Sequence, residues 1–186
     1  MTIQYINFLV SATNSAPRSL PESIRQVGNL SAGFCHSWLS NDIPDALTTS
    51  EEAFQLFDHI QNEILRHRDE QSKQSAWTSS VFKAALDATV GELLEPATSS
   101  EIAFFKSCPL GDARLTLGAT TVPLTLAVAL NKLKHRSTST LNFTISSSGA
   151  HVLYIFTNAG MNKPDTISRF SVNIFCGACK IAAAAI

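Results

Sequence analysis

Apolar residues recur at intervals of three and four positions through the middle of the chain, which is the spacing of one face of an α-helix. The clearest case is residues 48–70, TTSEEAFQLFDHIQNEILRHRDE. Its regularly spaced apolar residues are Phe54, Phe57, Ile60 and Ile64. Thr49 and Glu52 have the spacing of a capping box, which satisfies backbone N–H groups at a helix start. We therefore expect a long amphipathic helix here.

Three other segments have helical character. Residues 75–94 (SAWTSSVFKAALDATVGELL) and 99–107 (SSEIAFFKS) carry apolar residues at helical intervals. Residues 123–136, PLTLAVALNKLKHR, begin with Pro123, which suits the first turn of a helix, and end in basic residues that complement the helix dipole. The pattern predicts a helical block over residues 50–107 and one more helix after it.

The last part of the chain changes to β-branched and aromatic residues. Residues 141–175, LNFTISSSGAHVLYIFTNAGMNKPDTISRFSVNIF, contain three such runs, separated by the turn sequences SSSGA and NAGMNKP. This pattern predicts an antiparallel meander, and residues 2–10 (TIQYINFLV) also read as extended. The expected fold class is α+β, with an N-terminal helical block followed by a C-terminal antiparallel β-sheet.

The length and composition are those of one globular domain. The chain has 186 residues, of which 45% are hydrophobic, enough for one substantial core. We place a single domain at residues 26–186 and interpret residues 1–25 as an N-terminal extension. Residues 11–15 of this extension are rich in Ser, Thr and Asn, a composition that suits a secretion leader.

Charge and hydropathy exclude several classes of partner. The formal net charge is -1, so the chain has no basic field to attract nucleic acid or an anionic membrane. Its longest apolar runs fall short of the roughly 18 residues that span a bilayer, so no transmembrane segment is expected. No basic residue precedes Arg18, which argues against a secretory signal peptide. We expect a protein that is cytoplasmic or exported by a non-classical route.

The cysteines do not form a disulfide framework. The four residues are Cys35, Cys108, Cys176 and Cys179. They are too few and too unevenly spaced for such a framework in a chain of this size, so we expect reduced thiols. The CGAC sequence at residues 176–179 matches Cys-x-x-Cys but lacks a second ligand pair for a metal. We predict no metal and no other cofactor.

One cysteine is a candidate nucleophile. Cys35 lies in GFCHSWLS, which reads as a junction between a loop and a helix. A helix N-terminus favours a thiolate because its free N–H groups and dipole are positive, so we expect a depressed pKa for Cys35. A nucleophilic thiol also needs an imidazole to take its proton. His151 is the best candidate because it begins the apolar run HVLYIF, which places its ring at a strand end.

A third polar residue would orient the imidazole. Asp165 is the only Asp or Glu after His151, and its position suits a strand, a turn and the start of the next strand. Asn158 and Asn162, in the same turn, are alternatives to Asp165.

A side-chain amide would complete the site. Asn29 precedes Cys35 by six residues and is placed to donate a hydrogen bond to an oxyanion beside the Cys35 backbone N–H. Gln26 competes with Asn29 for that role. The predicted site is therefore Cys35, His151 and Asp165 with Asn29 at the oxyanion hole.

With these residues the chain resembles the papain-like cysteine proteases, and among them the YopT and AvrPphB type of bacterial type III secretion effectors. Those proteins similarly have Gly-x-Cys opening a helix with a Trp soon after, as GFCHSW does here, then a helical block, a His opening a strand and an acid on the next strand. The resemblance implies a thiol hydrolase that is secreted into a host cell and acts there on a protein substrate, such as a host protein, in virulence. The chain departs from the family in reading GAHV around His151 and KPDT around Asp165.

Two other functions stay open at this point. The chain is alternatively a non-enzymatic effector or accessory protein that binds a partner protein through its helical block. The same thiol and imidazole would also serve an acyltransferase or a deamidase. A Cys35 sulfur within hydrogen-bond reach of a His151 ring nitrogen favours an enzyme, and a buried Cys35 without that contact favours a binding protein.

Overall fold

The computed structural model describes residues 19–137, 140–158, 160 and 163–186. Within these ranges the helices are α2 (Leu20–Leu39), α3 (Ile43–Gln71), α4 (Val81–Asp87), α5 (Ser99–Ser107), α6 (Leu126–Lys134) and α7 (Val172–Ala184), with a 3-10 turn at Trp77–Ser79. The strands are β1 (Thr89–Leu94), β2 (Val122–Thr125), β3 (Leu141–Ile145), β4 (His151–Thr157) and β5 (Thr166–Ser171). They form one antiparallel sheet in the order β2-β1-β5-β4-β3. The α+β class predicted from the sequence is confirmed.

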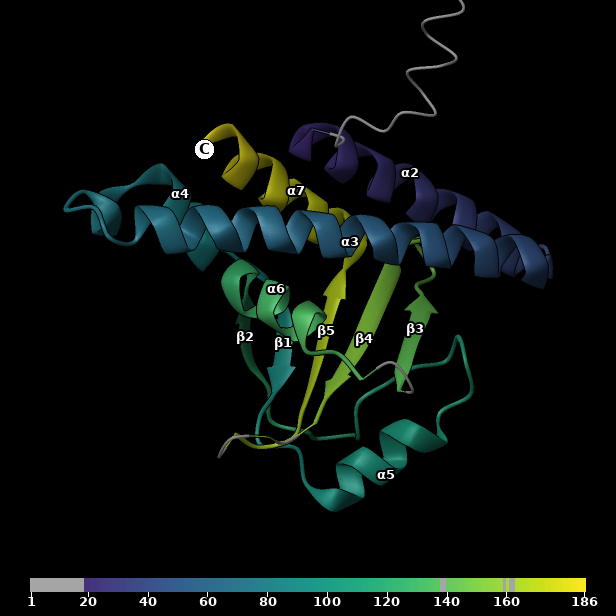
Figure 1. Ribbon diagram of the computed structural model, residues 1–186. Helices are drawn as coiled ribbons and strands as arrows, with labels where there is room; N and C mark the ends of the chain where they lie inside the picture. The colour runs from purple at the N-terminus through teal and green to yellow at the C-terminus, as the bar shows by residue number, and fades with distance from the viewer. Residues whose placement is uncertain (1–18, 138–139, 159, 161–162) are drawn as a thin grey trace, which may run out of the picture.

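Helices cover the sheet unevenly. Figure 1 shows α2, α3 and α7 side by side across the end of the sheet at which β4 begins, with α5 at the opposite end. Alternate residues of β4 serve two apolar clusters, because successive side chains of a strand point to opposite faces. Leu153 and Ile155 belong to the large cluster with α2, α3, α6 and α7. Tyr154 and Phe156 belong to a smaller cluster with Phe105 of α5.

The folded body begins earlier than we predicted. Pro21 and Glu22 lie in the first turn of α2, where a proline and an acid are both favourable. Ile24 of the same helix is fully buried in the large cluster. Residues 20–25 therefore pack with the folded body, six residues before the domain start that we predicted at residue 26.

The long helix α3 also begins earlier than its predicted capping box. Asp42 is the N-cap, and its carboxylate accepts a hydrogen bond from the Asp45 N–H at 3.2 Å. Pro44 occupies the first turn. Thr49 and Glu52 lie inside the helix, so the predicted capping box does not start it.

Part of the predicted helical block is strand. Residues 75–94 form the 3-10 turn and α4 and then β1, which pairs with β2 and β5. Gly91 of β1 makes the close pairing possible, because a Cβ there would lie 2.0 Å from the Arg169 carbonyl oxygen. Pro123 lies in edge strand β2, where a missing N–H is tolerated. Strand pairing here overrides helical periodicity.

The predicted meander is confirmed, with one change at its end. Strands β3, β4 and β5 pair consecutively, and the chain enters α7 at Val172. The CGAC sequence is helical, with Cys176 and Cys179 both buried on α7.

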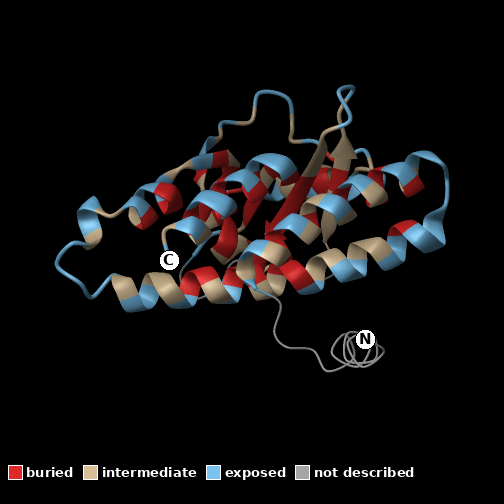
Figure 2. Cartoon of the chain, turned by 90° about the horizontal axis from the view of Figure 1, so that it is seen from above, coloured by how far each residue is buried: buried red, intermediate tan, exposed pale blue. Residues whose placement is uncertain are grey.

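The extended segment predicted at residues 2–10 lies outside the described residues. Figure 2 shows buried residues alternating with exposed and intermediate ones along the helices, as expected for amphipathic helices. No helix of the described ranges combines the length and hydrophobicity that crossing a membrane requires.

Candidate functional site

Cys35 is not at a helix N-terminus. It lies in the last third of α2, four residues before the helix ends, and its side chain is buried. Backbone N–H groups there are already bonded within the helix, and the dipole at this end opposes a negative charge. Burial raises the pKa of the Cys35 thiol. The predicted helix start and depressed pKa are therefore both wrong.

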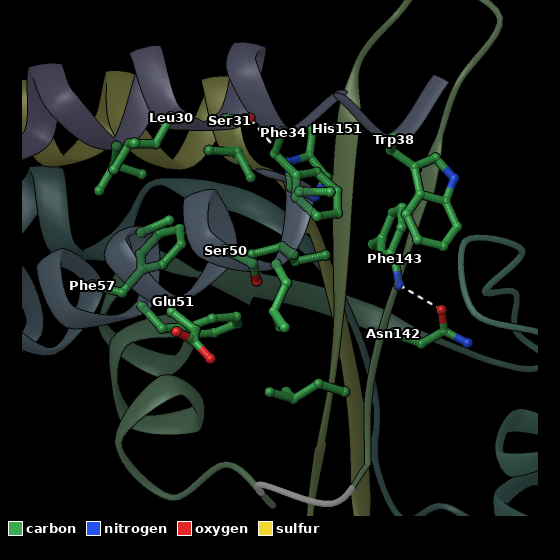
Figure 3. Close-up of a pocket in the computed structure, with 18 of the residues that line it drawn as sticks. Leu30, Ser31, Phe34, Trp38, Ser50, Glu51, Phe57, Asn142, Phe143 and His151 are labelled. Atoms are coloured by element: carbon green, nitrogen blue, oxygen red, sulfur yellow. Dashed lines mark hydrogen bonds between the residues drawn. The ribbon is translucent and has the colours of Figure 1, made fainter. Parts of the chain in front are cut away.

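His151 begins a strand, as predicted, and its ring lies against α2. Its Nδ1 atom is hydrogen-bonded to the Ser31 hydroxyl at 3.0 Å. The imidazole stacks on Phe34, with ring centroids 4.8 Å apart, and meets the Phe143 ring edge to face. Figure 3 shows this hydrogen bond and the two neighbouring aromatic rings. The strand thus docks on the predicted helix, but one turn before Cys35.

The surroundings of His151 keep its imidazole neutral. Burial lowers the pKa of His151 to about 4, since a charged ring would lose its hydration. The Nε2 atom is buried and has no hydrogen-bond partner among the described residues. Because Nδ1 is bonded to Ser31, neither ring nitrogen is bonded to Cys35. A base this weak is a poor proton acceptor at neutral pH.

Asp165 lies at the far end of the sheet from His151. In the β4–β5 ladder Thr157 pairs with Thr166, so Asp165 is beside the end of β4, whereas His151 is at its start. The six residues of β4 between its start and its end place Asp165 about 20 Å from His151. Asn158 follows β4 at the same far end, and Asn162 lies outside the described residues. Neither Asp165 nor Asn158 orients the His151 ring.

Asn29 does not form an oxyanion hole with Cys35. It is exposed on α2, and six residues of α-helix place it roughly 120° around the axis from Cys35. Gln26, the alternative, donates a hydrogen bond to Glu22 at 3.1 Å. The predicted catalytic set of Asn29, Cys35, His151 and Asp165 is therefore not assembled.

The structure instead places a pocket between α2, α3 and the strands β3 and β4. Its volume is about 450 Å³, within the range usual for ligand sites. Most of its lining is aromatic or aliphatic, including Leu30, Phe34, Trp38, Phe54, Phe57 and Phe143. Ser31 and His151 also line it, so the hydrogen bond between them forms part of the wall. Figure 3 shows these side chains gathered around the pocket.

A loop tied to β3 completes the pocket wall. The Asn142 side chain accepts a hydrogen bond from the Gly111 N–H at 3.0 Å and donates one to the Pro109 carbonyl at 3.0 Å. Gly111 has a φ of 89° and lies so close to Trp38 that a Cβ would be 2.7 Å from the indole. Only glycine suits this contact. The loop therefore holds Leu110 at the pocket.

The pocket rim exposes large aliphatic side chains. Ile43, Leu47 and Leu110 all line the pocket and are 46%, 59% and 62% exposed. Scattered exposed aliphatic residues are common, but these three all line the same pocket and so add exposed apolar surface to it.

One carboxylate lies among these apolar groups. Glu51 of α3 lines the pocket and is exposed, and its side chain forms no ion pair or hydrogen bond within the part of the chain that the structure describes. It is the single acidic or basic side chain, other than His151, among the described lining residues. Figure 3 shows Glu51 among the side chains drawn around the pocket.

Sequence reasoning did not identify this pocket. The sequence held one indication of it. Ile43 and Leu47 precede the helix start that we predicted at Thr49, and they continue the apolar face of α3 toward its N-terminus. The contribution of the loop at Leu110 had no comparable signal, because its position depends on the pairing with Asn142.

The described residues contain no cluster of three or more His, Cys, Asp or Glu side chains suited to a metal ion. Comparison of the chain with known protein families, curated proteins and solved structures found no match. The papain-like resemblance accordingly stays a prediction from the sequence.

Proposed function

We propose that the protein is a non-enzymatic binding module that takes apolar side chains of a partner protein into the pocket between α2, α3 and the sheet. The observation that carries this proposal is the apolar pocket of about 450 Å³ with three exposed aliphatic residues at its rim. This proposal follows the alternative that we drew from the sequence, a protein that binds a partner through its helical block. The binding surface is now the first half of α3 together with α2, β3 and β4.

The rim favours a protein over a small molecule as occupant. A small apolar ligand would fill the interior and leave Ile43, Leu47 and Leu110 in water. A partner protein would bury the rim as well, which adds roughly 25 cal/mol for each square ångström of apolar surface removed from water. Interfaces of this kind have a buried apolar centre that anchors side chains of the partner.

Site-specific photo-crosslinking tests the proposal. A photoreactive amino acid at position 47 is expected to give a discrete protein adduct in cells that express the chain. The adduct should disappear when Ser50→Phe fills the pocket, because Ser50 lines it. The matched control Ser72→Phe lies at the C-cap of the same helix, about 30 Å away along its axis, and should leave the adduct unchanged.

The neutral dye N-phenyl-1-naphthylamine supplies a second measurement on the purified protein. We expect saturable fluorescence enhancement that Ser50→Phe abolishes and Ser72→Phe preserves. Dye binding without any adduct at position 47 would assign the pocket to a small molecule and overturn the protein-binding proposal.

Thiol hydrolysis on a papain-like fold is the second candidate. It is favoured by one observation, namely that His151 contacts Ser31 and Phe34, which lie within one turn of Cys35 on α2. A movement of the ring by one helical turn would be needed to bring it to the thiol. A thiol-directed protease probe that labels the wild type but not Cys35→Ala would support this function. Equal labelling of both proteins would argue against it.

A further inference from the structure

We infer that the partner segment is an amphipathic helix that carries a Lys or Arg side chain beside its apolar anchors, with that cation paired to Glu51. This inference rests on the proposed function, because it specifies what enters the same pocket. Its basis is the position of Glu51, the pattern of charge around it, and the state of the neighbouring strand edge.

Glu51 is placed to select the charge of the occupant. Its carboxylate lies at a pocket whose other described walls are apolar or uncharged, and it has no ion-pair partner within the described chain. An occupant that covers the rim would remove water from this carboxylate. An anionic or purely apolar occupant would leave the charge desolvated and unpaired, which is costly. A cation beside the apolar anchors avoids that cost.

The surrounding sequence reinforces this selection. No Lys or Arg occurs between Arg25 and Arg66, a span that includes the second half of α2 and most of α3. The acidic residues of that span are Asp42, Asp45, Glu51, Glu52, Asp58 and Glu63. The nearby guanidinium of Arg136 packs on Phe54 but is already bonded to Asp58, at 2.6 Å and 2.8 Å. Glu63 is likewise paired, with Arg66. The stretch of α2 and α3 that contributes to the pocket thus carries acidic residues and no Lys or Arg of its own, which favours a basic partner.

The strand edge next to the pocket favours a helix over an added strand. The edge of β3 is already covered by the 109–113 loop, because the Ala113 N–H donates to the Phe143 carbonyl at 3.0 Å and Asp112 bridges to Thr144. A partner cannot pair its backbone with these positions. Contact at these positions is therefore left to side chains, as when the apolar face of a helix enters a groove with anchors spaced three and four residues apart.

Two synthetic peptides test the inference on the full chain. Both are amphipathic helices with the same leucine face, and they differ only in having Lys or Glu at the charged positions. Fluorescence anisotropy in low salt should give about tenfold tighter binding of the Lys peptide, as expected for a few partly exposed ion pairs. The preference should shrink as salt is raised.

The Glu51→Lys variant should cancel or reverse the preference. Glu70→Lys makes the same change of net charge at the far end of α3 and should leave it nearly intact. Ser50→Phe should abolish binding of both peptides, because it fills the shared pocket.

Each other outcome overturns the inference in a distinguishable way. Equal binding of both peptides, with displacement of the naphthylamine dye, would remove the role of Glu51 while the proposed function stands. If Glu70→Lys lowered the preference for the Lys peptide as much as Glu51→Lys does, the preference would come from the net charge of the protein and not from Glu51. A wild-type dimer that Leu47→Glu dissociates would assign the pocket to a second copy. Failure of both peptides together with loss of the position-47 adduct would overturn the proposed function as well.

Discussion

The Ser31 hydroxyl and the His151 Nδ1 atom lie 3.0 Å apart and join α2 to the first residue of β4. The two residues are far apart in the chain, so the bond ties the N-terminal helix pair to the C-terminal sheet. A partly buried hydrogen bond of this kind contributes about 1 kcal/mol, and leaving a buried partner unsatisfied costs about 1–3 kcal/mol. The two residues form part of the pocket wall, and the protonation of His151 can be measured to follow the state of that wall.

Stability should depend on pH through His151. Its pKa is about 4 in the folded chain and near 6.5 in an unfolded one, so the unfolded chain takes up a proton first as the pH falls. The free energy of unfolding should therefore decrease from pH 6.5 to pH 4, by on the order of 2–3 kcal/mol from this residue, and be insensitive to it above pH 7.5. Urea unfolding across this range measures the effect. His151→Gln should flatten the slope, whereas the exposed control His36→Gln should not.

The distance between Asp165 and His151 makes a separate prediction. Asp165→Ala should leave the pKa of His151 unchanged, because about 20 Å of strand separates the two residues. Ser31→Ala removes the hydrogen bond to Nδ1 and should shift that pKa measurably. NMR titration of the imidazole carbon-bound protons measures both. A shift in Asp165→Ala as large as that in Ser31→Ala would restore the predicted pairing of acid and imidazole.

Thiol reactivity should follow burial. Cys35, Cys176 and Cys179 are buried and burial raises the pKa of each, to about 11 for Cys176. Cys108 is only partly buried. Iodoacetamide at neutral pH should therefore label the more accessible Cys108 first and Cys35 more slowly. Mass-spectrometric mapping of a time course identifies the order. Fastest labelling at Cys35 would point back to a catalytic thiol.

Two glycines should respond to alanine in opposite ways. Gly91→Ala places a Cβ 2.0 Å from the Arg169 carbonyl oxygen in the β1–β5 ladder, so the strands must separate, at a cost of about 2–4 kcal/mol. Gly28→Ala on α2 has no heavy atom within 4 Å of the new Cβ and should stabilise the helix by up to about 1 kcal/mol. Thermal unfolding of the two variants provides the comparison. Equal effects would mean that the β1–β5 ladder is looser than the structure has it.

Local patterns in the sequence were enough to determine the C-terminal half of the sheet and several helices. Turn residues flank the runs that become β3, β4 and β5, so the meander was predictable from neighbours in the chain. The helix at residues 99–107 was predictable from the helical spacing of its apolar residues, and the structure adds a capping box between Thr98 and Glu101. The start of a strand at His151 also followed from the sequence alone.

Long-range packing decided the rest. Residues 89–94 have helical spacing but become β1, because pairing with β5 satisfies their backbone. The start of α2 at Leu20 buries Cys35 near the C-terminal end of a helix, where the sequence predicted a helix start. The antiparallel register sends Asp165 to the opposite end of the sheet from His151. The pocket joins residues of α2, α3, β3, β4 and the 109–113 loop, and such a meeting depends on how elements dock, which no local pattern of residues encodes.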